Sequence, residues 1–350
     1  MLPRLDISFP LCSQHAFWFG GTYAPPSGEY LLNHARTGIV MALRTALPNG
    51  GRVGVVAYNC HTVANAIVES GCEPIFVDVT EDLHINTTHL SSLKMEALVV
   101  TNLFGIHNDI DAIRAAQPNA ILIVDNAHGY GLPAEGEFTV YSINQGKFPA
   151  LGEGGVLAVN NAQYLATIQQ QYDSLPVYGR VKEIKLFITM LLKAWMHMPC
   201  IYGLITQRLK AHRGATNCRE SIIKRKMANG VRRMYQQALP DIPHAIELRK
   251  QNAQAIADKL ICNGLVQNAW YGENAFMLIA RCKDPQQVQT YFAQHGMETA
   301  THFAKTIEWA KQFGYTDGAC PMAERLTKEL IMIPTYCLCK YKVERLKFNV

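Results

Sequence analysis

The chain has 350 residues, and 33 lysine and arginine residues against 28 aspartate and glutamate residues give it a formal net charge of +5. At roughly 150 residues per domain, this length indicates about two domains and allows a large core without crosslinks. A hydrophobic content of 49% and a charged content of 17% exclude a disordered chain. A charge of +5 is too small to indicate binding to nucleic acid.

The cysteines are scattered along the chain and form no CxxC pair. Residues 1–6 lack the apolar segment and the cleavage site of a signal peptide. We therefore expect a cytoplasmic protein with reduced thiols. The clustered ligand spacing of a zinc site is also absent, so the sequence predicts no metal.

The first half of the chain alternates apolar runs with helical patterns. The runs lack the alternation of half-exposed strands, which indicates strands buried on both faces. The strand–helix–strand rhythm is typical of a doubly wound α/β sheet, whose ligands gather at the carboxyl ends of the strands. The expected strands are 52–57, 74–79, 97–101, 120–125, 138–142 and 155–159, with helices at 62–70 and 109–116.

The second half of the chain has a different order of expected helices and strands. Residues 165–239 show long helical patterns and almost no strand signal. After Pro240 the pattern predicts a helix at 246–260, short strands near 275–280 and a helix at 285–295. We expect a large domain over residues 1–239 and a smaller α+β domain over residues 240–350.

Three features stand at the ends of consecutive expected strands: Asp125, Ser142 with Lys147 five residues later, and the glycine-rich turn 152–155. Alone, each has an ordinary explanation, since such residues also cap helices, form turns or face solvent. Together, they are the groups that a pyridoxal phosphate site needs. The carboxylate keeps the pyridine nitrogen protonated, the lysine forms the Schiff base and moves protons, and the hydroxyl and backbone amides hold the phosphate.

Several segments resemble motifs of the DegT/StrS-type sugar aminotransferases, which are fold-type-I enzymes dependent on pyridoxal phosphate. The strongest are Tyr-Ser-Ile-Asn-Gln-Gly-Lys at 141–147 with Gly-Glu-Gly-Gly at 152–155, and Cys-Pro-Met-Ala-Glu-Arg at 320–325 with Met-Ile-Pro at 332–334. Supporting segments lie at 57–67, 71–78 and 124–129. The resemblance implies a mostly parallel central sheet with flanking helices, a smaller C-terminal domain and a homodimer.

The resemblance also implies roles for individual residues. Lys147 would be the Schiff-base lysine, and Asp125 would pair with the pyridine nitrogen. His128 would lie near the phenolic oxygen of the cofactor, and Ser142 would hold its phosphate. The remaining phosphate candidates occupy a turn before an expected helix and are Arg36, Thr37 and Gly38.

Three positions depart from the family pattern. The aromatic residue that stacks on the cofactor ring aligns with Cys60 or its neighbour His61, and we favour the imidazole of His61. The basic segment 224–227 is the nearest match to the phosphate contact from the partner subunit. His302 stands where the family brings a small-domain residue towards the sugar, although a surface histidine is an equal alternative.

The resemblance predicts transamination of a keto sugar, nucleotide-linked or of another kind, with glutamate as the amino donor. Some relatives carry histidine in place of the lysine and act as sugar dehydratases, so Lys147 favours transamination. Two alternatives stay open. One is a pyridoxal-phosphate-dependent sugar dehydratase or lyase, and the other is a non-catalytic regulatory protein on the same scaffold.

Residues 180–233 are not explained by the resemblance. This segment carries 13 lysine and arginine residues and two acids, a net charge of +11, so the rest of the chain has −6. An apolar run at 186–198 is interrupted by Lys193 and His197 and followed by Pro199, which argues against a membrane-spanning helix. One interpretation is an insert at a dimer interface whose bases face a nucleotide diphosphate or solvent. The other is peripheral association with the inner face of a membrane.

Overall fold

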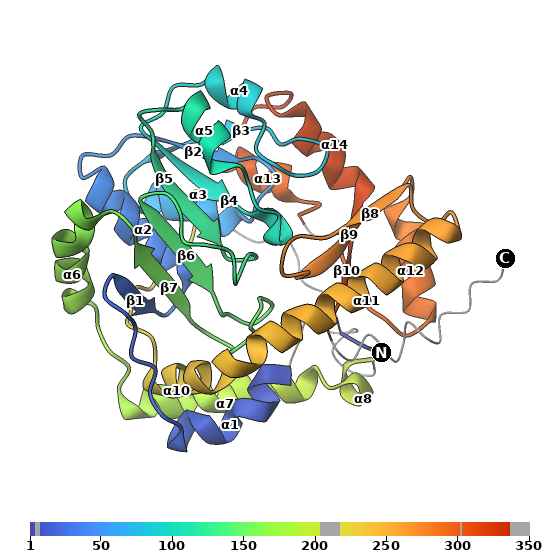
Figure 1. Ribbon diagram of the computed structural model, residues 1–350, viewed down its shortest axis with the longest axis horizontal. Helices are drawn as coiled ribbons and strands as arrows, with labels where there is room; N and C mark the ends of the chain where they lie inside the picture. Colours follow the sequence, from blue (N-terminus) through green and yellow to red (C-terminus); the bar gives the residue numbers. More distant parts are fainter. Residues whose placement is uncertain (4–7, 204–217, 302, 337–350) are drawn as a thin grey trace.

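A seven-stranded sheet forms the centre of the molecule (Figure 1). The computed structural model describes residues 1–3, 8–203, 218–301 and 303–336. The strand order is β1-β7-β6-β5-β4-β2-β3; β2 to β6 run parallel, and β7 is antiparallel to both β6 and β1. The strands are β1 (Glu29–Leu32), β2 (Arg52–Val56), β3 (Glu73–Val77), β4 (Ala97–Thr101), β5 (Ile121–Asn126), β6 (Phe138–Ser142) and β7 (Gly155–Val159).

Both faces of this sheet are buried, as the unalternating apolar runs predict. Along β4, Leu98 and Val100 belong to one hydrophobic cluster, and Val99 between them belongs to the cluster on the opposite face. The helices that follow or precede these strands are α2 (Ala35–Ala46), α3 (His61–Glu69), α4 (Thr87–Ser91), α5 (Ile110–Ala116) and α6 (Leu165–Ser174). Short 3-10 turns are η1 (Leu103–Gly105), η2 (Ala162–Tyr164) and η4 (Leu239–Asp241).

A three-stranded antiparallel sheet of order β10-β9-β8 organises the C-terminal part. Its cluster of buried side chains also includes Leu2, which bridges to Met297. The fold class is therefore the predicted one, and the boundary near residue 240 stays a prediction. The elements are α11 (Ile242–Cys262), β8 (Asn268–Trp270), β9 (Met277–Arg281), α12 (Pro285–Gln294), α13 (Thr306–Lys311), α14 (Pro321–Glu329) and β10 (Leu330–Pro334).

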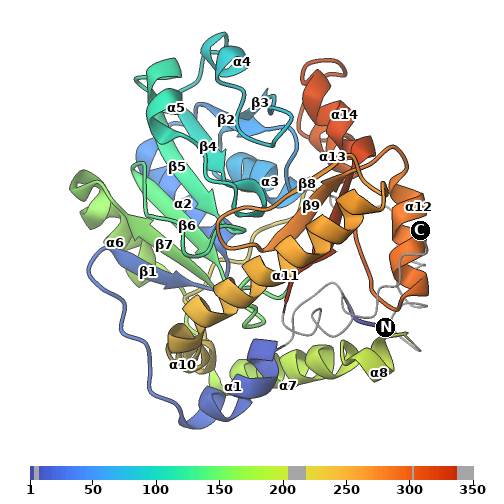
Figure 2. The same cartoon turned by 45° about the vertical axis from the view of Figure 1, so that its right-hand side comes forward.

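Helices α1 (Ser8–Phe19), α7 (Arg180–Met196) and α10 (Asn229–Ala238) lie together beside β1 and β7, and α8 (Pro199–Ile201) follows α7 (Figure 2). Gly230 allows the close approach of α1 and α10, because a Cβ atom there would lie 2.3 Å from the Phe17 ring. The Phe17 ring also lies 4.9 Å from the Phe187 ring of α7. These three helices thus form one packed group, to which the described parts of the basic segment contribute α7 and part of α10.

Candidate active site

A cavity opens where the carboxyl ends of β4, β5 and β6 meet the N-terminal ends of α2 and α3. This is the edge of a parallel sheet at which ligands are expected. The lining brings together most of the predicted site residues, although they come from segments far apart in the sequence. Those residues are Arg36, Cys60, Asp125, His128, Ser142 and Lys147.

Two helix N-termini face this cavity and make one end of it suited to an anion. The N-cap residues are His34 for α2 and Cys60 for α3, and in the described structure neither side chain caps its own helix. Backbone amides in the first turn of both helices carry partial positive charge, although the N-cap amide of Cys60 donates to Oδ1 of Asn59 at 2.7 Å. Nε of Arg36 is buried and has no hydrogen-bond partner among the described residues. A phosphate group would satisfy these donors together.

Asp125 and Lys147 are the titratable pair of the cavity. Asp125 is 3% exposed at the end of β5, and one of its carboxylate oxygens accepts a hydrogen bond of 3.0 Å from the backbone of Ala127. Burial raises the pKa of Asp125, and the charge of Lys147 opposes that rise. Burial lowers the pKa of Lys147, and the charges of Cys60 and Asp125 oppose that fall. Each group therefore favours the ionised form of the other.

His128 is held in one orientation by its neighbours. Its Nδ1 accepts a hydrogen bond of 3.2 Å from the backbone of Phe104, so the neutral ring carries its proton on Nε2. The ring stacks on Phe276 at 4.8 Å and on Phe104 at 5.3 Å between centroids. His128 can thus present a fixed N–H donor to a group bound in the cavity.

His34 closes one side of the cavity. Its Nδ1 lies 3.1 Å from Oδ1 of Asn144, and that amide oxygen also accepts a hydrogen bond from the backbone of Gly154. Burial, with the charge of Arg36, lowers the pKa of His34 to about 4. The imidazole is therefore neutral at physiological pH.

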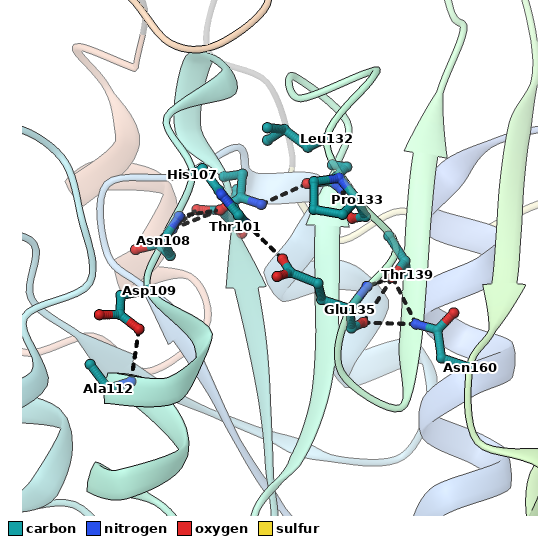
Figure 3. Close-up of polar contacts among 12 residues, drawn as sticks. Thr101, His107, Asn108, Asp109, Ala112, Leu132, Pro133, Glu135, Thr139 and Asn160 are labelled. Carbon is teal, nitrogen blue, oxygen red and sulfur yellow. Dashed lines mark hydrogen bonds and ion pairs between the residues drawn. The ribbon is translucent and has the colours of Figure 1, made fainter.

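The loops that follow β4 and β5 are joined by polar contacts (Figure 3). Nε2 of His107 lies 2.7 Å from Oε2 of Glu135, and the backbone N–H of Glu135 donates to Oγ1 of Thr139 at 2.8 Å. The side-chain amide of Asn108 donates to the carbonyl of Thr101 at 3.2 Å. These contacts fix the strand ends from which Thr101 and Asp125 reach the cavity.

Three predicted residues lie outside the cavity lining. The hydroxyl of Thr37 donates to Asn33 at 2.9 Å, and Gly38 lies where a Cβ atom would be 2.9 Å from Val140. The ring of His61 lies 5.0 Å from Trp309, in a T-shaped arrangement. His302 lies outside the described residues. The roles assigned to these positions by resemblance stay predictions.

Five further polar lining residues were not predicted: His34, Asn59, Thr62, Thr101 and Asn144. Thr101 ends β4 and Asn59 follows β2, so the rule that ligand groups gather at strand ends could have found both. Asn144 lies inside the predicted 142–147 block. No signal in the sequence marks His34.

A second cavity, here called the α7 pocket, adjoins the first and has a volume of about 370 Å³. His34 lines both cavities. Four cationic side chains line this pocket, Lys182, Lys185 and Lys193 of α7 with Arg225. The half-buried Glu153 accepts a hydrogen bond from Tyr178 in this pocket, and partial burial raises its pKa. The pocket is thus suited to a ligand with several negative charges.

The fold is that of the fold-type-I class, whose members bind pyridoxal phosphate. The chain belongs to the DegT/DnrJ/EryC1/StrS aminotransferase family, whose model matches residues 32–345.

Known proteins similar to this chain differ in what their names describe. A pleiotropic regulatory protein of Geobacillus stearothermophilus is 20% identical over 304 residues, covering 82% of this chain and 74% of that protein. The sugar aminotransferase CalS13 of Micromonospora echinospora has a TM-score of 0.72 at 15% identity and covers both chains fully. The E. coli GDP-4-keto-6-deoxy-D-mannose-3-dehydratase, solved with hydrated PLP, has a TM-score of 0.67 at 16% identity, covering 97% of this chain and 92% of that one.

Proposed function

We propose that this protein is a pyridoxal-phosphate-dependent aminotransferase that converts a keto sugar to an amino sugar. The observation that carries the proposal is one cavity that holds a lysine, a buried carboxyl and an unpartnered guanidinium nitrogen at two helix N-termini. These groups match the aldehyde, the pyridine nitrogen and the phosphate of the cofactor. The unsatisfied Nε of Arg36 supports the fit most directly, because buried donors are rarely left without an acceptor.

Each cavity residue has a defined task in this proposal. Lys147 binds the cofactor through Nζ and then moves the proton at the reacting carbon, for which its lowered pKa is suited because a neutral amine can accept a proton. Asp125 stabilises a protonated ring nitrogen, and His128 donates from Nε2 towards the ring oxygen. Arg36 and Ser142 hold the phosphate with the amides of α2 and α3. When bound, the cofactor supplies the electron sink for exchanging a keto group and an amino group.

The substrate in this proposal is a nucleotide-linked keto sugar. The α7 pocket adjoins the cofactor cavity and presents three lysines and an arginine, which suits a diphosphate. The E. coli neighbour is named for a sugar linked to GDP, which supports the same substrate class. Glutamate as the amino donor rests on the family resemblance alone.

Dehydration is the nearest competing reaction, because that E. coli neighbour is a dehydratase. In the family that this chain resembles, some members carry histidine in place of the cofactor lysine and act as dehydratases. This chain has Lys147 at that position. The presence of an amine that can bind the cofactor favours transamination.

The test uses the purified protein with pyridoxal phosphate. We expect a visible absorbance band of the bound cofactor that disappears in Lys147→Ala and persists in Lys94→Ala, a variant of an exposed lysine outside the cavity. Adding glutamate should bleach the band, and a nucleotide-linked keto sugar should restore it. A protein without the band would be a non-catalytic relative. A band that glutamate and other amino donors leave unchanged would exclude transamination.

A further inference from the structure

Helix α7 exposes a continuous apolar face. Five of its apolar side chains are between 46% and 80% exposed and recur every three or four residues. This spacing places them in one line along a helix. We call this line the α7 stripe, and it consists of Val181, Ile184, Ile188, Leu192 and Trp195.

The stripe does not result from a loosely attached helix. Met190 and Ala194 on another face of α7 are buried at 7% and 3% exposure. Phe187 packs against Phe17 and Trp18 of α1, with ring centroids 4.9 and 5.3 Å apart. One face of α7 is therefore fixed to the body of the protein, and the apolar stripe points away from it.

The end of α1 extends the apolar surface. Trp18 is 38% exposed and Phe19 is 75% exposed. The ring of Trp18 contacts that of Phe187, and the end of α1 lies beside α7 (Figure 2). Large aromatic side chains at an edge are typical of surfaces that enter the interface between lipid and water.

The charges around the stripe are almost all positive. Helix α7 carries Arg180, Lys182, Lys185 and Lys193 and a single acid, Glu183. The carboxylate of Glu183 accepts a hydrogen bond of 2.7 Å from the backbone of Asn229, so it caps α10. An anionic surface would complement the remaining charge.

The same charges weigh against a second copy of the chain as the occupant. Pairing two α7 stripes would bring two copies of α7, each with four basic residues and one acid, to one interface. Like charges facing each other destabilise such a contact. Among the described residues, no helix is long and apolar enough to cross a membrane, so the stripe would lie along a bilayer and not through it.

We propose that α7, with the end of α1, binds the surface of a bilayer containing anionic phospholipid. The α7 stripe enters the boundary between headgroups and acyl chains, and the exposed lysines of α7, which also line the α7 pocket, lie next to the headgroups. This proposal does not rest on the catalytic function.

The test is flotation of the purified protein with phosphatidylcholine vesicles that do or do not contain phosphatidylglycerol. We expect binding to the anionic vesicles only, and weaker binding at high salt. The triple variant Ile184→Asn/Ile188→Asn/Leu192→Asn should bind about tenfold less or worse, because three apolar side chains no longer enter the lipid. The matched control is Ile261→Asn, which changes an exposed isoleucine on α11 and should bind as the wild type does.

The far-ultraviolet circular dichroism and thermal midpoint of each variant show that it is folded. The proposal is overturned if the wild type stays at the bottom of the gradient with anionic vesicles, or if the triple variant floats equally well. It is also overturned if the triple variant changes only the oligomeric state in sedimentation, since the stripe would then be an interface between copies.

Discussion

Asp125, Lys147 and Arg36 show that the cavity is arranged for a ligand and not for the stability of the empty protein. Burial disfavours the ionised forms of Asp125 and Lys147, and the buried Nε of Arg36 lacks an acceptor in the described part of the chain. Unsatisfied or desolvated polar groups cost free energy in the folded state. Such a cost is typical of functional sites, where the ligand offsets it.

Arg36 gives a prediction for cofactor affinity. Arg36→Met should raise the dissociation constant for pyridoxal phosphate by roughly 10- to 100-fold, since a hydrogen bond to a charged group contributes about 1.5–3 kcal/mol. The measurement is a fluorescence titration of the cofactor-free protein. Arg44→Met is the control, because Arg44 lies on the same helix, away from the cavity, and donates to the carbonyl of Glu69. Equal affinities for wild type and Arg36→Met would remove Arg36 from the phosphate site.

His34 gives a prediction for pH dependence. Its pKa is about 4 in the folded protein, against 6.5 for an ordinary histidine side chain, so the unfolded chain binds more protons between these two pH values. The contribution to stability is therefore complete above pH 6.5 and is lost as the pH falls towards 4, by roughly 2 kcal/mol between pH 7 and pH 4.5. Urea unfolding of wild type and His34→Gln at both pH values measures the difference. A pH dependence that is identical in the two proteins would contradict the prediction.

At the scale of elements, the start of α2 lies directly on the start of β7. A Cβ atom on Gly155 would lie 2.3 Å from the backbone nitrogen of Ala35. The glycine at this position thus has a packing role, because it lets the N-terminus of α2 reach the cavity. Gly155, the first residue of β7, therefore packs against the helix N-terminus at the end of the cavity that is suited to an anion.

We expect Gly155→Ala to destabilise the protein by about 1–3 kcal/mol and to weaken cofactor binding, because the added methyl group moves α2. Gly21→Ala is the matched control, since a Cβ atom there meets nothing within 4 Å. Chemical denaturation measures the stability of both variants. If both lose the same stability, the contact between α2 and β7 is not the cause.

Much of the central sheet could be predicted from apolar runs alone. The expected strands at 97–101, 138–142 and 155–159 coincide with β4, β6 and β7. The pattern missed β1, because Glu29–Leu32 is a four-residue edge strand, too short for a periodic signal.

The residues of the candidate site likewise include some that could be predicted from the sequence and some that could not. Strand-end residues such as Asp125 could be predicted, because topology brings the carboxyl ends of parallel strands together. The rotation of a helix could not, since it depends on packing between segments far apart in the sequence. His61 therefore faces Trp309, and its neighbour Cys60 lines the cavity.

At the scale of the whole molecule, the cavity collects side chains from residues 34 to 147 of one chain, and the family resemblance implies that a second chain completes the site. The 224–227 segment, the expected partner contact, already contributes Arg225 to the α7 pocket within one chain. Arg225 also lies over the ring of Tyr178, at 5.5 Å from its centroid.

We expect a homodimer in solution because of this resemblance. Sedimentation of the cofactor-bound protein should give twice the chain mass of 39.0 kDa. The triple variant of the α7 stripe should have the same mass, since the stripe points away from the buried face of α7 and from the α7 pocket. A wild-type species of 39.0 kDa that is fully active would show that one chain is sufficient.

The imidazole of His34 lines both the cofactor cavity and the α7 pocket, and it is uncharged at physiological pH. Because a neutral side chain adds no opposing charge, an anion bound in the α7 pocket would change the electric field in the cofactor cavity. The absorbance maximum of a cofactor bound there would report this change. Inorganic phosphate added to the cofactor-bound protein should displace the absorbance maximum before any chemistry takes place.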